Sequence, residues 1–114
     1  MADRAETLLK TGTEIALVPE LWWYEMRNIL VVGERRGRIS IADTAAFLRE
    51  VSQLRIELVT ARDDAPLLDL ARKHNLAIYD AAYLALALRE RLQLATLDKR
   101  LEAAAVTEGI ALLK

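Results

Sequence analysis

The chain of 114 residues contains no cysteine, two prolines and four glycines. The absence of cysteine excludes disulfides, thiolate nucleophiles and zinc–sulfur sites, and it is consistent with a reducing compartment. No apolar run reaches the roughly 18 residues that a membrane span needs. The charged N-terminus also lacks the apolar segment of a signal peptide. We therefore expect a cytoplasmic protein that has no membrane-spanning helix.

The few glycines argue against a nucleotide-binding domain. Gly12, Gly33, Gly37 and Gly109 form neither a G-x-G-x-x-G pattern nor a P-loop. A receiver-like α/β domain is also disfavoured, because adjacent acids at the end of a first strand are absent. The formal charge of −1 gives no sign of a nucleic-acid partner for the molecule as a whole. Basic residues do cluster locally, for instance in residues 35–38 and 89–91, where solvated helix ends are the simpler interpretation. Lys99 and Arg100 differ, because they directly follow Asp98.

The chain does contain enough apolar sequence for a core. Hydrophobic residues make up 54% and charged residues 29%, which predicts one globular domain over residues 1–114. The apolar pattern predicts strands at residues 14–18, 56–60, 94–97 and 110–113. It predicts helices at residues 3–10, 20–36, 40–53, 63–75, 81–91 and 98–106. Strands separated by helices predict an α/β fold with a parallel sheet flanked by helices.

Three acidic residues follow strands or begin helices in this pattern. Glu25 lies in the helix after the first predicted strand, Asp80 opens a helix, and Asp98 follows the strand at residues 94–97. Ligands in open α/β sheets bind beyond the carboxyl ends of the strands, so we expect the three carboxylates to converge there. Carboxylates gathered by a fold can hold a hard divalent cation.

Each acid also has a structural interpretation. Glu25 shares a helix face with apolar residues, where it could form a salt bridge or mark the edge of the apolar stripe. Asp80 and Asp98 could each be the N-cap of a helix. Asn28 could orient Glu25, and Thr96 could hydrogen-bond a water on the metal, or both could be ordinary polar residues of a helix and a strand.

Three consecutive aromatic residues, Trp22, Trp23 and Tyr24, fall in the same helix as Glu25. A helix cannot bury three consecutive side chains on one face. We therefore expect at least one of them to be exposed and to face a partner.

Three segments together resemble the PIN-domain family. Residues 18–28 resemble its second-acid segment, in which a proline precedes a helix with a Glu and then an Asn. Residues 79–87, which begin Tyr79-Asp80-Ala81-Ala82-Tyr83, are similar to its third-acid motif, and residues 94–101 are similar to its fourth. The short length and the form of the third-acid motif are most similar to VapC-type toxins of type II toxin–antitoxin systems.

The resemblance implies an endoribonuclease that depends on Mg²⁺ or Mn²⁺, is commonly a homodimer and is held inactive by a cognate antitoxin. It implies that Glu25, Asp80 and Asp98 are catalytic metal-site acids, with Asn28 and Thr96 as supporting groups. Lys99 and Arg100, which directly follow the last acid, would contact the RNA backbone.

The chain departs from the family pattern at its start. PIN domains usually begin with an apolar strand that ends in the first catalytic Asp, and this strand is central in the sheet. No apolar run precedes Asp3, so we expect the first strand and its acid to be missing, through a misplaced start site, a truncation or a rearranged remnant. We therefore expect a poor nuclease, and the alternative is a catalytically inactive PIN-like module for interaction or dimerisation.

Overall fold

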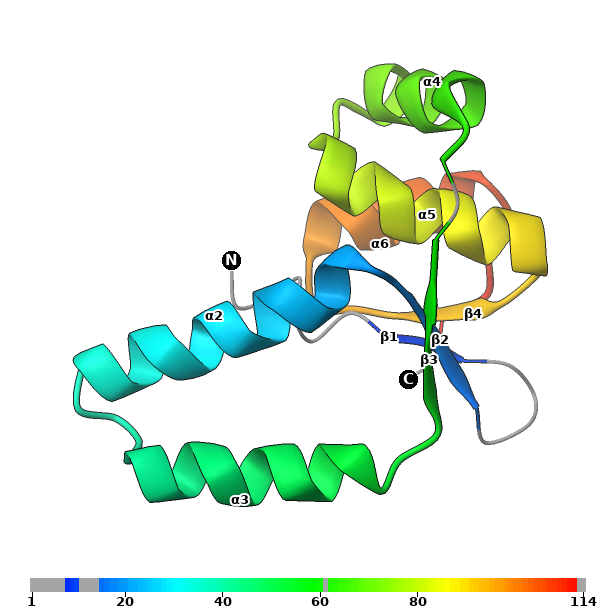
Figure 1. Ribbon diagram of the computed structural model, residues 1–114. Helices are drawn as coiled ribbons and strands as arrows, with labels where there is room; N and C mark the ends of the chain where they lie inside the picture. The colour runs from blue at the N-terminus through cyan, green and yellow to red at the C-terminus, as the bar shows by residue number, and fades with distance from the viewer. Residues whose placement is uncertain (1–7, 11–14, 61, 113–114) are drawn as a thin grey trace.

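The computed structural model describes residues 8–10, 15–60 and 62–112. Strands and helices alternate along much of the chain, as the apolar pattern predicts, and Figure 1 shows their arrangement. In chain order they are β1 (Leu8–Lys10), β2 (Ala16–Pro19), α2 (Leu21–Arg35), α3 (Ile41–Ser52), β3 (Ile56–Val59), α4 (Asp64–His74), α5 (Ile78–Glu90), β4 (Gln93–Ala95) and α6 (Lys99–Thr107).

The four strands form one sheet in the order β3-β2-β1-β4. β2 pairs parallel with β3, whereas β1 pairs antiparallel with both β2 and β4. Because β1 runs opposite to both of its neighbours, β2, β3 and β4 all run in the same direction and their carboxyl ends share one rim. The α/β fold class is confirmed, and the sheet is parallel except at β1.

The predicted helix at residues 3–10 is wrong at residues 8–10, which form β1; residues 3–7 lie outside the described part. Tertiary pairing overrides local helix preference here. β1 lies between β2 and β4 and pairs with both strands. The backbone N–H and C=O groups on the facing edges of β2 and β4 therefore find hydrogen-bond partners in β1. β1 therefore occupies an interior position in the sheet, in the reversed direction.

The predicted last strand at residues 110–113 is reduced, in its described part, to a parallel bridge between Leu112 and Leu94. Residue 113 lies outside the described residues. The boundaries of the other elements move by a few residues. Most notably, α5 begins at Ile78 and takes in the segment 78–79 that we expected to be a connector.

The core is centred on α5. Five of its residues are buried: Ala81, Tyr83, Leu84, Leu86 and Ala87. They pack in one cluster with residues of the sheet and of α6, including Val18, Leu94 and Leu101. Figure 1 shows α4, α5 and α6 gathered on one side of the sheet. Burial of this apolar surface is the main stabilising term, at roughly 25 cal/mol per Å².

Helices α2 and α3 extend away from this body as an antiparallel pair (Figure 1). Ser40 caps α3 through a capping box with Asp43, which fixes where the second helix begins. The hydroxyl of Thr44 donates to Glu34 over 2.6 Å and ties the two helices together near their connection. No residue of α3, all of which is described, is buried. The pair is therefore a projecting hairpin with much exposed surface.

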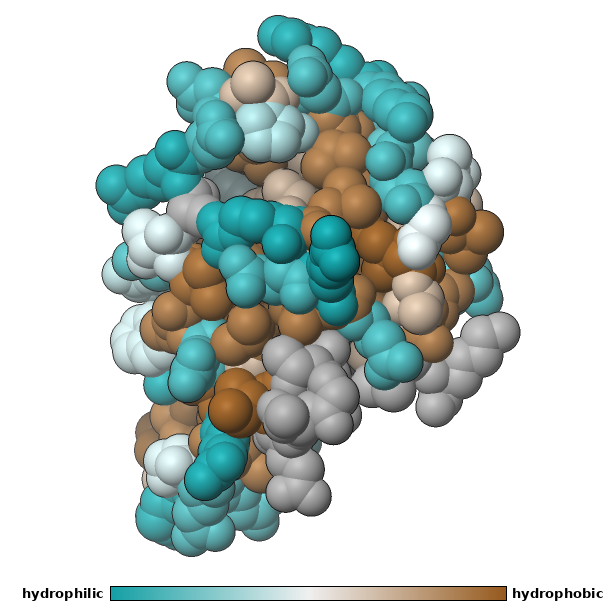
Figure 2. Space-filling model, turned by 90° about the vertical axis from the view of Figure 1, so that its right-hand side faces the viewer, coloured by the Kyte–Doolittle hydropathy of each residue, from teal (hydrophilic) through white to brown (hydrophobic). Residues whose placement is uncertain are grey.

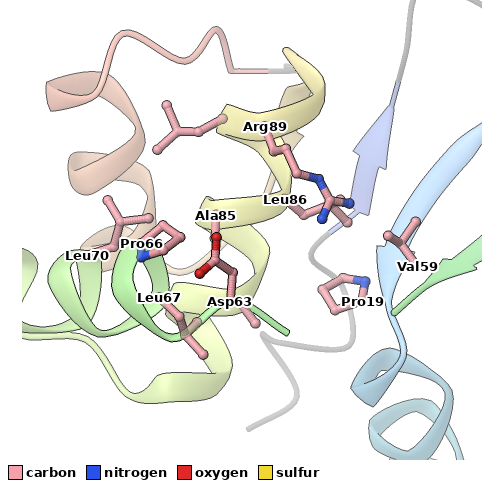
Figure 3. Close-up of a pocket in the computed structure, with 11 residues that line it drawn as sticks. Pro19, Val59, Asp63, Pro66, Leu67, Leu70, Ala85, Leu86 and Arg89 are labelled. Carbon is pink, nitrogen blue, oxygen red and sulfur yellow. The ribbon is translucent and has the colours of Figure 1, made fainter. Parts of the chain in front are cut away.

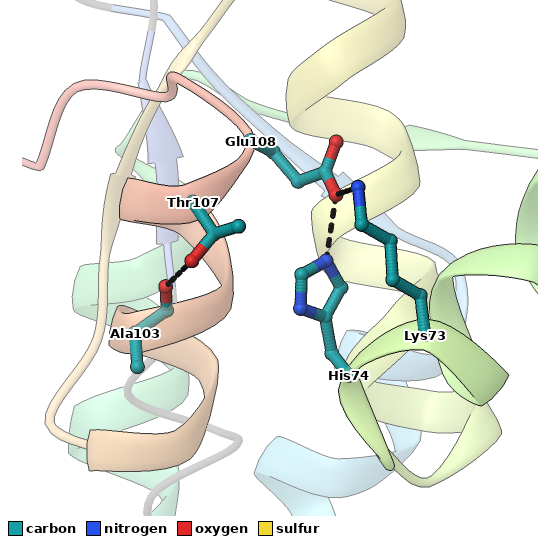
Figure 4. Close-up of polar contacts among 5 residues, drawn as sticks. All are labelled: Lys73, His74, Ala103, Thr107 and Glu108. Carbon is teal, nitrogen blue, oxygen red and sulfur yellow. Dashed lines mark hydrogen bonds and ion pairs between the residues drawn. The ribbon is translucent and has the colours of Figure 1, made fainter.

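Helices α4 and α6 are joined by a polar cluster that we call the α4–α6 clasp: Lys73, His74 and Glu108 (Figure 4). Lys73 Nζ and His74 Nε2 lie 2.7 and 2.6 Å from Oε2 of Glu108. The side chains of His74 and Glu108 are only 11% and 16% exposed. Lys73, and after it His74, lower the pKa of Glu108 below its usual value of 4.5.

Within the described residues, no helix combines the length and the apolar character that crossing a membrane requires.

The clasp predicts a pH-dependent contribution to stability. Glu108→Gln should lower the free energy of unfolding at neutral pH by about 1 kcal/mol, because Lys73 and His74 lose the ionised carboxylate that they contact. The pKa of Glu108 is lower in the folded than in the unfolded state, so its contribution is complete above the unfolded value and is lost as pH falls through the folded value. Urea unfolding from neutral to acidic pH measures this.

Glu50→Gln, at an exposed position of α3, is the matched control and should change stability little at any pH. A difference between Glu108→Gln and the wild type that stayed constant into the acidic range would contradict the electrostatic account of the clasp.

Candidate functional site

Glu25 lies on the side of α2 that faces α5. Its Oε1 accepts a hydrogen bond of 2.9 Å from the hydroxyl of Tyr83. Tyr83 is fully buried, and a buried phenol usually has a hydrogen-bond partner for its hydroxyl. We considered a salt bridge to an arginine for Glu25; the hydrogen bond that the structure shows is with a neutral hydroxyl. The contact links the second-acid segment to the third-acid motif, since Tyr83 belongs to the latter.

Asp80 lies in the first turn of α5, whose N-cap is Ala77. The interpretation of Asp80 as the N-cap is therefore wrong. A carboxylate in the first turn is still stabilised by the positive end of the helix dipole. Oδ1 of Asp80 is buried. Tyr83 lies three residues further along, on the same side of the helix. Glu25 is thus brought to the helix face that also carries Asp80.

Asp98 is the N-cap of α6, as one of our two interpretations predicted. Its Oδ1 accepts hydrogen bonds from the backbone N–H groups of Arg100 and Leu101, over 2.9 and 3.0 Å. The backbone N–H of Asp98 in turn donates to the hydroxyl of Thr96 over 3.0 Å. Thr96 therefore shapes the turn between β4 and α6 in this structure, and Asp98 begins the helix.

The remaining predicted residues lie on the surface. Asn28, Lys99 and Arg100 are exposed. Arg100 reaches across to the carbonyl oxygen of Asn75 at the end of α4, with Nη1 at 3.4 Å. Lys99 and Arg100 open α6 beside Asp98, which places two cations at the end of β4. Their position is compatible with a contact to a phosphate backbone.

Among the residues that the structure describes, no group of three or more His, Cys, Asp or Glu side chains could hold a metal ion. Asp98 accepts from the backbone of α6 and Glu25 from Tyr83. Mg²⁺ commonly takes only one or two carboxylates and keeps several waters. The assignment of the acids as metal ligands stays a prediction.

The interior strand β1, which lies between β2 and β4, consists of Leu8, Leu9 and Lys10. Its register places Leu8 opposite Ala95, at the carboxyl end of β4. The amino end of β1 therefore lies at the rim at which β2, β3 and β4 end.

An apolar cavity of about 390 Å³ lies between α4, α5 and the ends of β2 and β3 (Figure 3). Pro19 and Val59 close it on the sheet side, and Asp63 and Arg89 add the charged groups of its lining. Figure 2 shows that apolar side chains also reach the surface on one face of the molecule, between hydrophilic residues. Small and apolar residues of α5, such as Ala82, Ala85 and Leu86, line the cavity from the helix side.

The consecutive aromatic residues divide as predicted. Trp22 is buried in the core, whereas Trp23 and Tyr24 are 40% and 66% exposed. The expectation that at least one of them is exposed is confirmed.

The PIN domain family model matches residues 1–106, which include Glu25, Asp80 and Asp98. No curated protein matches the chain.

The contact between α2 and α5 predicts that Tyr83→Phe lowers the free energy of unfolding by about 1–2 kcal/mol, because Glu25 loses a donor in a half-buried position. Urea unfolding measures the change. Tyr24→Phe removes the same hydroxyl at a largely exposed position and should have little effect. Equal stability of Tyr83→Phe and wild type would show that the hydrogen bond is not needed to hold α2 against α5.

The helix cap that Asp98 forms on α6 predicts that two substitutions of this residue differ in their effect on stability. Asp98→Ala should cost about 1 kcal/mol of stability, whereas Asp98→Asn should be close to wild type, because Asn caps helices about as well as Asp. Thermal and urea unfolding of the pair decide between a cap and a purely electrostatic role. Equal destabilisation by both substitutions would contradict the cap.

Proposed function

The chain belongs to the PIN domain family, and from this premise we propose that it is the ribonuclease component of a toxin–antitoxin pair, of the metal-dependent endoribonuclease class. The observation that carries the proposal is the family match over residues 1–106, which spans all three acid motifs. The contact between Glu25 and Tyr83 supports it, because it joins two of these motifs in space.

In this proposal Glu25, Asp80 and Asp98 are the metal-site acids and Mg²⁺ or Mn²⁺ is the cofactor. Asn28 and Thr96 are supporting groups, and Lys99 and Arg100 hold RNA phosphates at the start of α6. Among the described residues, the three acids do not form one group of metal ligands. We therefore propose that residues 1–114 belong to one PIN-like domain and that the nuclease activity of this chain is weak.

A cognate antitoxin and a second copy of the chain are the proposed protein partners. The projecting hairpin supports a partner, because Ile41 on α3 is 77% exposed and no residue of this helix is buried. An apolar side chain exposed to that degree gains free energy when a partner covers it.

The second candidate function is a PIN-like module that binds or dimerises without catalysis. The engagement of Asp98 as a helix cap favours it, since a carboxylate that is bonded to two backbone N–H groups is less available to a cation. This module would keep the fold and its partners and would bind no divalent ion tightly.

An RNA cleavage assay tests the nuclease. With purified protein and single-stranded RNA, we expect slow cleavage with Mn²⁺, none in EDTA and none for Asp80→Asn. Asp69→Asn, at an exposed position of α4, is the matched control and should cleave as the wild type does. Cleavage that persisted in Asp80→Asn or in EDTA would contradict the proposed site.

Calorimetric titration with Mn²⁺ separates the two functions. A weak binding isotherm that Asp80→Asn abolishes supports the nuclease. The absence of both binding heat and cleavage supports the interaction module.

A further inference from the structure

The outer face of α2 and the turn that follows it carry aromatic and cationic side chains together. We call this surface the α2 strip: Trp23, Tyr24, Arg27, Arg35, Arg36 and Arg38. Trp23 and Tyr24 lie at the start of the helix, Arg27 lies one turn further, and the other arginines lie at the end of the helix and in the connection to α3. With a rise of 1.5 Å per residue, the 15 residues of α2 extend over about 22 Å.

The aromatic end of the strip is ordered by contacts among its own members. The rings of Trp23 and Tyr24 meet edge to face with centroids 5.1 Å apart. The guanidinium carbon of Arg27 lies 3.6 Å from the centroid of the Trp23 ring, and its Nη1 donates to the backbone carbonyl of Trp23 over 3.2 Å. Two exposed rings and a planar cation are thus held as a stacked group at the surface, although the core needs neither ring.

The other end of the strip is an exposed group of cations. Arg35, Arg36 and Arg38 are exposed, and none of them forms an ion pair with another residue that the structure describes. The acids nearest in sequence are engaged elsewhere. Glu34 accepts from Thr44, and Asp43 accepts from the backbone N–H of Ser40. The positive charge of this end is therefore not neutralised within the described structure.

Charge is segregated along the whole of α2. The exposed positions of residues 21–38 are Trp23, Tyr24, Asn28, Val31, Arg35, Arg36, Gly37 and Arg38, and none of them is acidic. The two acids of the helix, Glu25 and Glu34, are half-buried and accept hydrogen bonds from Tyr83 and Thr44. In a chain with a formal charge of −1, the charged residues that are exposed between positions 21 and 38 are thus all cationic.

We propose that the α2 strip binds single-stranded RNA, with unpaired bases stacked on Trp23 and Tyr24 and phosphates held by the arginines at the far end. Base stacking on aromatic rings and on arginine, combined with cations along the backbone, is how proteins hold single strands without reading their sequence. Duplex RNA offers no free base faces to the rings, so the aromatic end favours the single strand. The inference rests on the proposed function, since it assumes that RNA is the substrate.

The strip lies on the same helix as Glu25 but on a different side, because Glu25 is turned toward Tyr83. Single-stranded RNA bound to the α2 strip would therefore lie beside the proposed acids and would not contact them through the strip. This role is positioning, and it does not depend on whether a metal binds.

Fluorescence anisotropy of a labelled single-stranded RNA, measured in EDTA so that no cleavage occurs, tests the strip. The variant Arg35→Ala/Arg36→Ala/Arg38→Ala should weaken binding about tenfold or more near physiological salt. It should also reduce the slope of log K against log salt by about two, as expected for the loss of three phosphate contacts. The control Arg49→Ala/Arg55→Ala/Arg72→Ala removes the same charge from exposed positions outside the strip and should retain most of the affinity.

Tyr24→Ala tests the aromatic end and should weaken binding about tenfold, whereas Tyr24→Phe should bind as the wild type does, because the ring is kept. RNA should also quench the emission of Trp23, and the quenching should disappear in Trp23→Phe, where only the buried Trp22 remains. Circular dichroism of each variant confirms that the fold is retained.

The outcomes separate the strip from the nuclease. Binding that is lost in the strip variants but not in the controls supports the strip, even if the wild type cleaves nothing. Equal binding by the strip variants and the controls, or no binding by the wild type, overturns it, and the cleavage assay then decides the proposed function on its own. A strip variant that kept RNA affinity but lost self-association would also overturn it and would identify the surface as an interface between copies.

Discussion

The hydrogen bond between the hydroxyl of Tyr83 and Glu25 links the buried core to the helix that leads out to the projecting hairpin. Tyr83 lies in the fully buried part of α5, the helix on which the core is built, and Glu25 belongs to the helix that leads out to the projecting hairpin. Burial of a phenol requires a partner for its hydroxyl, and the partner found here is an acid. One interaction thus satisfies a core residue and fixes the direction in which α2 leaves the body.

The same contact gives one of the proposed metal-site acids a role in stabilising the fold. An acid that accepts from a phenol and an acid that caps a helix both contribute to the fold, each through one carboxylate oxygen. Functional sites are often places where local stability is sacrificed. In this structure Glu25 and Asp98 both serve stability. The exposed cations and aromatic rings of α2 have no such role, because the core does not use them.

The sequence predicted most of the elements and the fold class, because helix stops such as Gly37, caps such as Ser40 and short apolar runs are local signals. It did not predict β1, because a three-residue strand is determined by the partners on both sides and not by its own residues. For the site, the two interpretations of Asp98 were equally consistent with its place before a helix, and only the backbone geometry shows the cap. The partner of Glu25 lies 58 positions away, a pairing that no spacing rule connects. Helix periodicity predicted that part of the aromatic run is exposed. It did not predict that Glu25 and Glu34 on the same helix accept hydrogen bonds from Tyr83 and Thr44, which depends on the packing of other helices.

The reversed direction of β1 has a practical consequence for work with this protein. Leu8 pairs opposite Ala95, so whatever is joined ahead of Leu8 enters the fold at the rim from which the chain continues to Glu25 and Asp98. A fusion partner joined directly to Leu8 would begin at that rim. A carboxy-terminal tag, which leaves the entry to β1 unchanged, is therefore the safer design for binding and activity measurements.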